Sequence, residues 1–237
     1  MIKTAVIIAG GASMRLRPLT EDLPKTLMKI NGQPILYWIL AWLKKQNVNH
    51  VVIGVAYKKE KIYEYMKENN NFGMKVDFSE HTVEGGTAQA FKFAIDRFVD
   101  DEDFLAMNGD ELTNLDIKKL YETHKNNNAK ITIAMAPFHC KFSVLDVGEN
   151  NKIIGFERDK RLKNVPVHIG INIFNKEVKN HIPATGNIEE IVFKEFAEGD
   201  LGIYGYMLGQ DEQWMTINTQ KDLEEANSFL TSWLSKP

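Results

Sequence analysis

A glycine-rich loop followed by cations is the first feature of the chain that could carry chemistry. Gly10-Gly11-Ala12-Ser13 comes directly after the apolar and β-branched run Thr4-Ala5-Val6-Ile7-Ile8. Small residues let backbone N–H groups approach an anion closely. Arg15 and Lys25 follow, and two prolines stiffen the path between the loop and the lysine. A buried strand, a small-residue loop and positioned cations together predict a binding site for a polyphosphate.

The same residues also allow a plain tight turn beside a solvated basic surface. The loop is not a Walker motif, because no Gly-Lys-Ser/Thr follows it. It also lacks the GxGxxG spacing of a dinucleotide-binding turn. The polyphosphate interpretation therefore depends on the longer pattern that surrounds the glycines.

A carboxylate follows another buried strand. Residues 103–107 are largely apolar and lead into Asn108-Gly109-Asp110. Open α/β sheets bind ligands at the carboxyl ends of their parallel strands. Asp110 is therefore a candidate ligand for Mg²⁺, which prefers oxygen ligands and bridges to phosphates. An ordinary Asn-Gly-Asp turn is the alternative.

The elements that must position these groups alternate between strand and helix in the first half of the chain. This order predicts an α/β fold with a mixed, mainly parallel sheet flanked by helices. We expect strands at 4–8, 50–55, 74–79, 103–107, 131–136, 142–147, 152–157 and 167–174, a late strand pair at 202–207 and 213–217, and helices at 35–43, 58–67, 84–98, 115–124 and 220–234. No linker or internal repeat appears, which predicts one domain over 1–237.

Bulk composition excludes several classes of protein. The 237 residues are 43% hydrophobic and 26% charged, as in soluble globular proteins. The net charge of −3 argues against binding of nucleic acid through overall positive charge. No apolar run is long enough to span a membrane, no signal segment precedes the first strand, and Cys140 is the single cysteine. We therefore expect a cytoplasmic protein.

The string G-G-x-x-x-R-L-x-P-L-T-x-x-x-P-K over 10–25 strongly resembles the signature of the sugar-phosphate nucleotidyltransferase family. The resemblance implies the nucleotide-diphospho-sugar transferase fold and the joining of a nucleoside triphosphate to a sugar 1-phosphate, with release of pyrophosphate. It also implies that Mg²⁺ is the cofactor. Arg15 would contact the β- and γ-phosphates, Lys25 the α-phosphate and Asp110 the metal ion. Ala9, Gly10, Gly11, Ala12 and Ser13 would bind the nucleotide.

The resemblance also predicts residues that contact the base. A Gly-Thr-Ala-Gln-Ala turn begins at Gly86 and matches the family turn that packs on the base, which adds Thr87 and Gln89. Glu80 and His81 fall where base-reading contacts are expected. Gln89 in this turn resembles thymidylyl- and uridylyltransferases, which favours a pyrimidine.

The resemblance divides the domain into a nucleotide-binding half, 1–112, and a sugar-phosphate-binding half, 113–237. The second half resembles the family's sugar-phosphate site less closely. Gly155-Phe156-Glu157 matches the start of the family's G-F-x-E-K-P segment, whose lysine binds the sugar 1-phosphate. Asp159 stands at the place of that lysine, so that Arg158, Lys160 or Arg161 could serve, and we select Lys160 with Glu157. Gly170 lies in a strand expected to pass beneath the sugar, and Glu189 is expected to bind sugar hydroxyls.

The second metal ligand is the largest departure from the family. The pattern W-x-D-x-G-T expects an aspartate where this chain has Thr216, and Asn218 replaces the glycine. If the strand continues, residues 216 and 218 share a face. The amide oxygen of Asn218 is then the predicted second metal ligand.

Other functions remain open at this stage. The acceptor could be phosphocholine or another small alcohol phosphate, with CTP as the donor. The loop Gly-Gly-Ala-Ser-x-Arg also occurs in molybdenum-cofactor guanylyltransferases, although Lys25 lies far beyond Arg15 for that class. A catalytically weak regulatory subunit of the same fold is a further alternative. No hexapeptide-repeat β-helix is present, which favours a stand-alone transferase whose partners are its two substrates, with a homo-oligomer left open.

Overall fold

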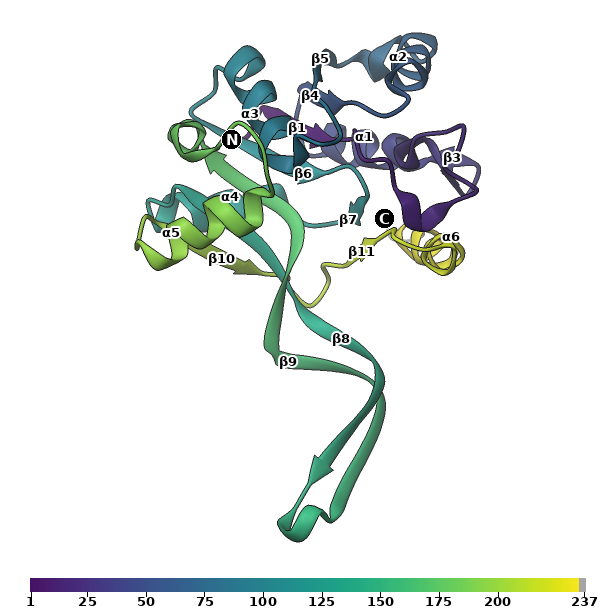
Figure 1. Ribbon diagram of the computed structural model, residues 1–237, viewed down its shortest axis with the longest axis vertical. Coiled ribbons are helices and arrows are strands. Elements are labelled where there is room, and N and C mark those ends of the chain that lie inside the picture. The colour runs from purple at the N-terminus through teal and green to yellow at the C-terminus, as the bar shows by residue number, and fades with distance from the viewer. Residues whose placement is uncertain (235–237) are drawn as a thin grey trace.

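The computed structural model describes residues 1–234, so the last three residues of the predicted domain lie outside it. The main sheet has seven strands in the order β10-β8-β9-β6-β1-β4-β5. β9 runs antiparallel to β6 and β8, and the other neighbouring strands are parallel. The predicted mixed, mainly parallel sheet flanked by helices is confirmed (Figure 1).

The elements follow the predicted alternation of strands and helices in the first half. Its strands are β1 (Thr4–Ile8), β2 (Lys29–Ile30), β3 (Gln33–Pro34), β4 (His50–Val55), β5 (Lys75–Glu80), β6 (Asp103–Asn108) and β7 (Glu111–Thr113), and its helices are α1 (Ile35–Lys45), α2 (Lys59–Glu68) and α3 (Gly86–Phe98). The second half contains β8 (Ile131–Val147), β9 (Ile153–Asn175), β10 (Ile203–Met207), β11 (Trp214–Thr216), α4 (Ile117–Asn126), α5 (Lys194–Glu198) and α6 (Gln220–Leu234). None of the helices in the described part of the chain has the length and apolarity needed to cross a membrane.

The sheet separates two layers of the core because strand side chains alternate between its faces. Ala5 and Ile7 of β1 pack with the apolar residues of α1, whereas Val6 packs with those of α3. This burial on both faces explains why the run at 4–8 is continuously apolar. The carboxyl end of β1 is thereby held rigidly at the edge of the sheet where the glycine loop begins.

The strands expected at 131–136, 142–147, 152–157 and 167–174 are wrong as separate elements. They form two long strands, β8 and β9, whose ladder continues through several register shifts. β-Bulges let a strand bend without ending it, so breaks in the alternation do not interrupt the pairing. The distal parts of β8 and β9 project from the body as a hairpin, which we call the arm, residues 138–165 (Figure 1).

The late strands also differ from expectation, because they do not pair with each other. β10 joins β8 at the edge of the main sheet, and β11 pairs with β7. β7 follows Asp110 directly, so its pairing with β11 brings residues 214–216 to the end of β6. Thr219 caps α6 as predicted: its Oγ1 accepts a hydrogen bond from the Asp222 amide at 3.2 Å.

Candidate active site

The glycine loop leaves the sheet with its amides unpaired. The Ala9 amide donates to the Gly54 carbonyl at 2.7 Å, and the Gly10 carbonyl accepts from the Tyr57 amide at 3.2 Å. Within the described chain, no protein group accepts a hydrogen bond from the amides of residues 10–13. Backbone amides rarely remain without an acceptor away from solvent, and Gly10 is buried. The loop therefore presents free donors where an anion could bind.

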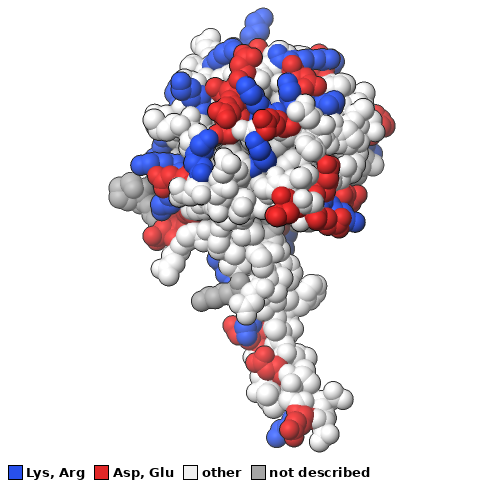
Figure 2. Space-filling view, turned by 90° about the vertical axis from the view of Figure 1, so that its left-hand side faces the viewer, with Lys and Arg blue, Asp and Glu red and all other residues white. Residues whose placement is uncertain are grey.

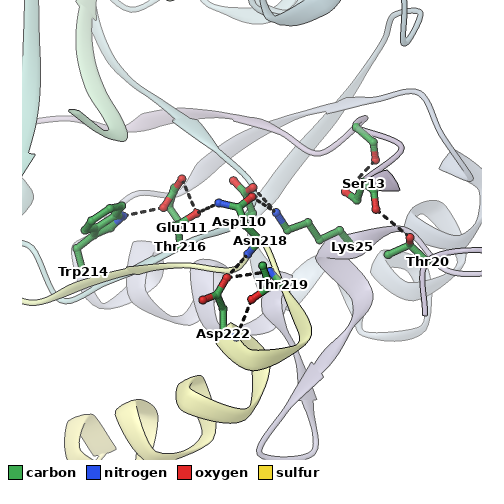
Figure 3. A network of polar contacts seen from close by, with 11 residues as sticks. Ser13, Thr20, Lys25, Asp110, Glu111, Trp214, Thr216, Asn218, Thr219 and Asp222 are labelled. Atoms are coloured by element: carbon green, nitrogen blue, oxygen red, sulfur yellow. Dashed lines mark hydrogen bonds and ion pairs between the residues drawn. The ribbon is translucent and has the colours of Figure 1, made fainter. Parts of the chain in front are cut away.

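Ser13 adopts a backbone conformation that usually requires glycine. Its φ of 47° and ψ of 49° lie in the left-handed region. The Thr20 hydroxyl donates to the Ser13 carbonyl at 3.1 Å and holds this turn in place (Figure 3). This hydrogen bond fixes the left-handed turn that precedes Arg15.

Lys25 and Asp110 meet although 85 residues separate them in sequence. The Lys25 Nζ lies 2.5 Å from Asp110 Oδ2 and 3.2 Å from Asn218 Oδ1 (Figure 3). Lys25 is only 8% exposed, and lysine is rarely so buried unless it is paired. The structure thus brings together three of the residues selected from the sequence.

A buried glutamate that the sequence reasoning missed extends this network. Glu111 accepts hydrogen bonds from Trp214 Nε1 at 2.7 Å and from the Thr216 hydroxyl at 3.2 Å, and Thr216 in turn accepts from Asn218 Nδ2 at 3.1 Å. Burial, together with the neighbouring Asp110 charge, raises the pKa of Glu111 well above its usual range. The signal available in the sequence was its position directly after Asp110.

The donor set at this point fits a magnesium ion. Asp110 Oδ2 and Asn218 Oδ1 converge on one cation, the Lys25 ammonium. Protein sites for Mg²⁺ often supply one or two oxygens and leave the remaining positions to water and substrate phosphates. Among residues 1–234, no cluster of three His, Cys, Asp or Glu side chains offers a fuller metal site.

Arg15 lies in the same loop but apart from this network. It is exposed on the short helical turn Met14–Leu16, and no carboxylate of the described residues lies within ion-pair distance of it. Its predicted contact with the outer phosphates stays a prediction.

The predicted base-binding residues fall into two groups. The His81 ring lies so close to Gly10 that a Cβ at position 10 would overlap it, and burial lowers the pKa of His81. Gln89 Oε1 accepts from the Thr82 amide at 2.9 Å and folds over Gly85. Glu80, in contrast, is engaged by Lys59 at 2.5 Å and by the Tyr63 hydroxyl at 2.8 Å.

Gly86 and Thr87 connect the two halves of the chain. A Cβ on Gly86 would overlap the Gly186 carbonyl, which accepts the Ala88 amide at 2.9 Å. The Thr87 hydroxyl accepts from the Ile188 amide at 2.9 Å. The turn expected to hold the base therefore also positions the segment that carries Glu189.

A cavity of about 920 Å³ adjoins the end of the network formed by Trp214 and Thr216. Trp214, Thr216 and Asp222 line it from the body, and His168 lines it from β9. The His168 Nδ1 is 3.1 Å from Glu189 Oε1, and hydrogen bonding to this histidine lowers the pKa of Glu189. His168 was not predicted from the sequence as a site residue.

Gly170, predicted to pass beneath the sugar, is surrounded by protein groups that require a small residue, and its contact with a sugar stays a prediction. Its φ is +71°, and a Cβ there would come within 2.9 Å of Asn108 Nδ2 and of the Glu111 side chain. No larger side chain fits between β9 and the end of β6 without displacing the buried glutamate.

Glu157 and Lys160 are not brought to this network. They lie on the arm and pair with each other, with Lys160 Nζ 2.8 Å from Glu157 Oε2. The cations that line the 920 Å³ cavity are Arg161 and Lys141. Lys141 also approaches Asp222 at 3.7 Å, whereas Arg161 has no carboxylate of the described residues within ion-pair distance.

Comparison with known proteins gives consistent matches along the chain. The family model described as "Nucleotidyl transferase" matches residues 4–232. The chain is 32% identical over 196 residues to D-glycero-alpha-D-manno-heptose 1-phosphate guanylyltransferase of Campylobacter jejuni, covering 82% of this chain and 84% of that protein. It is 29% identical to a probable glucose-1-phosphate cytidylyltransferase of Bacillus subtilis, covering 95% of each. The inositol-1-phosphate CTP transferase of T. maritima has a similar fold, with a TM-score of 0.76 at 20% identity over 99% of this chain and 97% of that one.

Proposed function

The chain belongs to the nucleotidyl transferase family, as the sequence resemblance predicted, and from this premise we propose that it joins a nucleoside triphosphate to a sugar 1-phosphate. A phosphate oxygen of the sugar 1-phosphate attacks the α-phosphorus of the triphosphate. The bond from that phosphorus to the bridging oxygen breaks, and pyrophosphate leaves. The products are a nucleoside diphosphate sugar and pyrophosphate.

The observation that carries the proposal is the placement of Lys25 and Asp110 beside a loop of free amides. The amides of residues 10–13 bind the triphosphate, and Lys25 neutralises charge that develops at the α-phosphate. The nucleophile is already an anion, so catalysis consists of positioning and charge neutralisation. Arg15, exposed on the same loop, contacts the outer phosphates.

Asp110 and Asn218 would hold Mg²⁺, because their oxygens already converge on a cation. When bound there, the ion would supply additional neutralisation of phosphate charge. Lys25 must then move from these oxygens to the nucleotide. Thr216 orients the Asn218 amide by accepting its Nδ2–H, which leaves the carbonyl oxygen on the side of the Lys25 ammonium, where it would be available to a metal ion.

The acceptor binds in the 920 Å³ cavity. His168 and Glu189 offer polar groups to sugar hydroxyls, and Gly170 lets β9 pass close to the site. Arg161 is the better placed cation for the sugar phosphate, because it lines the cavity and Lys160 is paired with Glu157.

Arg161→Ala should raise the KM for the acceptor by about tenfold, the expected loss of one hydrogen bond to a charged group. Lys160→Ala is the matched control; the reverse outcome would restore Lys160 to that role.

Two observations point to different donor bases. Gln89 beside Gly86 favours a pyrimidine, whereas the relative at 32% identity carries the name of a guanylyltransferase. UTP, dTTP, CTP and GTP must therefore be compared directly.

The test is a matrix of these four triphosphates against sugar 1-phosphates, phosphocholine and inositol 1-phosphate, with Mg²⁺-dependent pyrophosphate release as the readout. Turnover with a sugar 1-phosphate supports the proposal. Turnover only with phosphocholine or inositol 1-phosphate would assign an alcohol phosphate as the acceptor. Nucleotide binding without any turnover would instead favour a regulatory subunit of the same fold.

A further inference from the structure

Glu111 is a buried acidic residue to which the proposed reaction gives no role. It is 6% exposed, and glutamate is almost never so buried unless it is paired. Charged side chains are abundant on the surface (Figure 2), yet no cation of the described residues lies within ion-pair distance of this carboxylate. Its two oxygens instead accept from neutral donors, the Trp214 indole and the Thr216 hydroxyl (Figure 3). The role of Glu111 therefore depends on these two partners.

The pairing of β7 with β11 brings the three side chains together. Glu111 lies opposite Thr216 in the antiparallel ladder, and opposite residues share a face. Trp214 lies two residues before Thr216 and so on the same face of its strand. The backbone thus determines which side chains meet, and the hydrogen bonds determine the direction in which each of them donates.

The two ends of this network can only donate hydrogen bonds, because an indole N–H and an ammonium carry no acceptor. At one end, Lys25 donates to Asn218 Oδ1 at 3.2 Å, and Asn218 Nδ2 donates to Thr216 Oγ1 at 3.1 Å. Thr216 passes its own hydrogen to Glu111 Oε1 at 3.2 Å. At the other end, Trp214 donates to Glu111 Oε2 at 2.7 Å. Every hydrogen bond in the network therefore points toward Glu111.

Only a group that accepts at both of its terminal atoms completes this network. Burial raises the pKa of Glu111, but the donors on its two oxygens and the Lys25 charge favour the carboxylate form. Glutamine has the same shape but carries a donor at one terminal atom. In Glu111→Gln, the oxygen would accept from Trp214, and the NH₂ group would donate to Thr216. The Thr216 hydroxyl would then donate to Asn218, whose amide would have to turn over.

We propose that Glu111 is a positioning residue that keeps the carbonyl oxygen of Asn218, and not its NH₂ group, on the side of the Lys25 ammonium. The Asn218 backbone is held separately, because its amide donates to Asp222 Oδ2 at 3.0 Å, so the network has only the side-chain amide to orient. An amide that turned over would present N–H groups to Mg²⁺, which requires oxygen ligands. The inference rests on the proposed function for the identity of the cation, and it adds a residue that acts through Thr216 and Asn218.

Binding of Mn²⁺ to the free protein tests the inference without turnover. Mn²⁺ takes the same oxygen ligands as Mg²⁺, and electron paramagnetic resonance measures the unbound ion. Glu111→Gln should weaken Mn²⁺ binding by about 10–100-fold, which is typical when a group that orients a metal ligand is lost. The Mg²⁺ concentration for half-maximal pyrophosphate release should rise by a similar factor. Wild-type Mn²⁺ affinity in Glu111→Gln overturns the inference.

Asn218→Asp separates the orientation of the amide from the negative charge of Glu111. A carboxylate has an acceptor oxygen on each side, so it has no donor to turn toward the metal. In the Asn218→Asp background, Glu111→Gln should therefore change the Mn²⁺ affinity by less than about threefold, a non-additive result. If Glu111 acted through its charge alone, the loss would be the same in both backgrounds, and this outcome overturns the inference.

Thr216 provides a second test if Glu111→Gln folds poorly. Thr216→Val keeps the shape of the side chain but can neither accept from Asn218 nor donate to Glu111, so it should weaken Mn²⁺ binding by about tenfold or more. Thr216→Ser returns the hydroxyl and should recover most of that affinity. Equal affinities of the valine and serine variants contradict the inference.

The outcomes also distinguish this inference from the proposed function. Loss of Mn²⁺ binding in Glu111→Gln, in a protein that turns over no pair of substrates, keeps the positioning role and refutes nucleotidyl transfer. Turnover by the wild-type protein with unchanged Mn²⁺ binding in Glu111→Gln has the reverse meaning. A wild-type protein that binds no Mn²⁺ at millimolar concentrations overturns the positioning role, because Asn218 would then hold no metal.

Discussion

Lys25 pairs with protein oxygens in the free protein and, on the proposed function, with the nucleotide when substrates are bound. It is almost buried and satisfies oxygens of Asp110 and Asn218, so the carboxylate is neutralised in the free protein. On the proposed function, a metal ion that uses the same oxygens must displace this ammonium. The phosphates of the nucleotide are the groups that can attract it away. Metal and nucleotide should therefore bind more tightly together than either does alone.

Replacing Lys25 by alanine should lower kcat by about 10²–10³, because one preorganised charge on the reacting phosphate is lost. Lys29→Ala, an exposed lysine four residues along the chain, is the matched control and should retain nearly full activity. Steady-state pyrophosphate release measures both variants, and thermal unfolding checks that each is folded. A Lys25→Ala enzyme with near-normal turnover would remove the lysine from the reaction.

Asn218→Asp should lower the Mg²⁺ concentration for half-maximal activity by about tenfold, because metal affinity increases with the charge of the ligands. Asp110→Asn should move it in the opposite direction. A magnesium titration of activity at saturating substrates compares the three proteins. No difference between Asn218→Asp and the wild-type protein would show that residue 218 is not a metal ligand.

At the scale of elements, the site is assembled where strands end. Gly10 follows β1, Asp110 follows β6, and β11 is placed beside them by its pairing with β7. The first two positions could be predicted, since an apolar run followed by glycine or aspartate is visible in the sequence. The pairing of β11 with β7 could not, because three-residue strands carry no alternation from which to infer a partner.

The arm could not be predicted from the sequence either. The charged run at 158–161 follows the strand expected at 152–157, and the bulges near Cys140 lie between the strands expected at 131–136 and 142–147, so the sequence predicts short separate strands in place of the continuous β8 and β9. The sequence favours Lys160 as the phosphate-binding cation because it stands next to Asp159, which replaces the family's lysine. The path of β9 instead brings Arg161 to the cavity. Glu111 was missed because its role depends on burial by Trp214, which is 103 residues away.

Gly170→Ala should destabilise the fold by about 2–3 kcal/mol, of which 1–2 kcal/mol is the general cost of a side chain in the left-handed region. The remainder comes from overlap with Asn108 and Glu111. Gly32→Ala is the control: Gly32 has a φ of +78°, but nothing lies within 4 Å of a Cβ there. Urea unfolding of both variants separates the two contributions, and equal losses would show that the contact at Gly170 relaxes without cost.

At the scale of the whole molecule, a buried polar group links stability to pH. His124 on α4 is 1% exposed and contacts Thr132 at 2.8 Å and Asp103 at 3.3 Å. Burial lowers the pKa of His124, so the folded protein binds a proton at this histidine less readily than the unfolded chain does. In the unfolded chain it takes up a proton below its ordinary pKa of about 6.5, which favours unfolding as the pH falls.

The free energy of unfolding should therefore decrease between pH 7.5 and 5.5, by about 1 kcal/mol from His124 alone. His124→Gln keeps a hydrogen-bonding side chain but does not titrate, so it should show a smaller decrease over this interval. His81, whose pKa is also lowered by burial, leaves part of the pH dependence in place. Urea unfolding at pH 7.5 and at pH 5.5 measures the decrease in the free energy of unfolding for both proteins. A decrease in His124→Gln as large as that of the wild-type protein would contradict the role of His124.

The contact between Gly86 and Gly186 limits how this enzyme could be re-engineered. The two glycines meet across the boundary between the halves, and amides on each side donate across it. A hybrid that takes residues 1–112 from this chain and the remainder from a relative would keep one side of that contact and lose the other. Donor and acceptor preferences are therefore not freely interchangeable modules. The turn at 85–88 and the segment at 186–188 have to be transferred together.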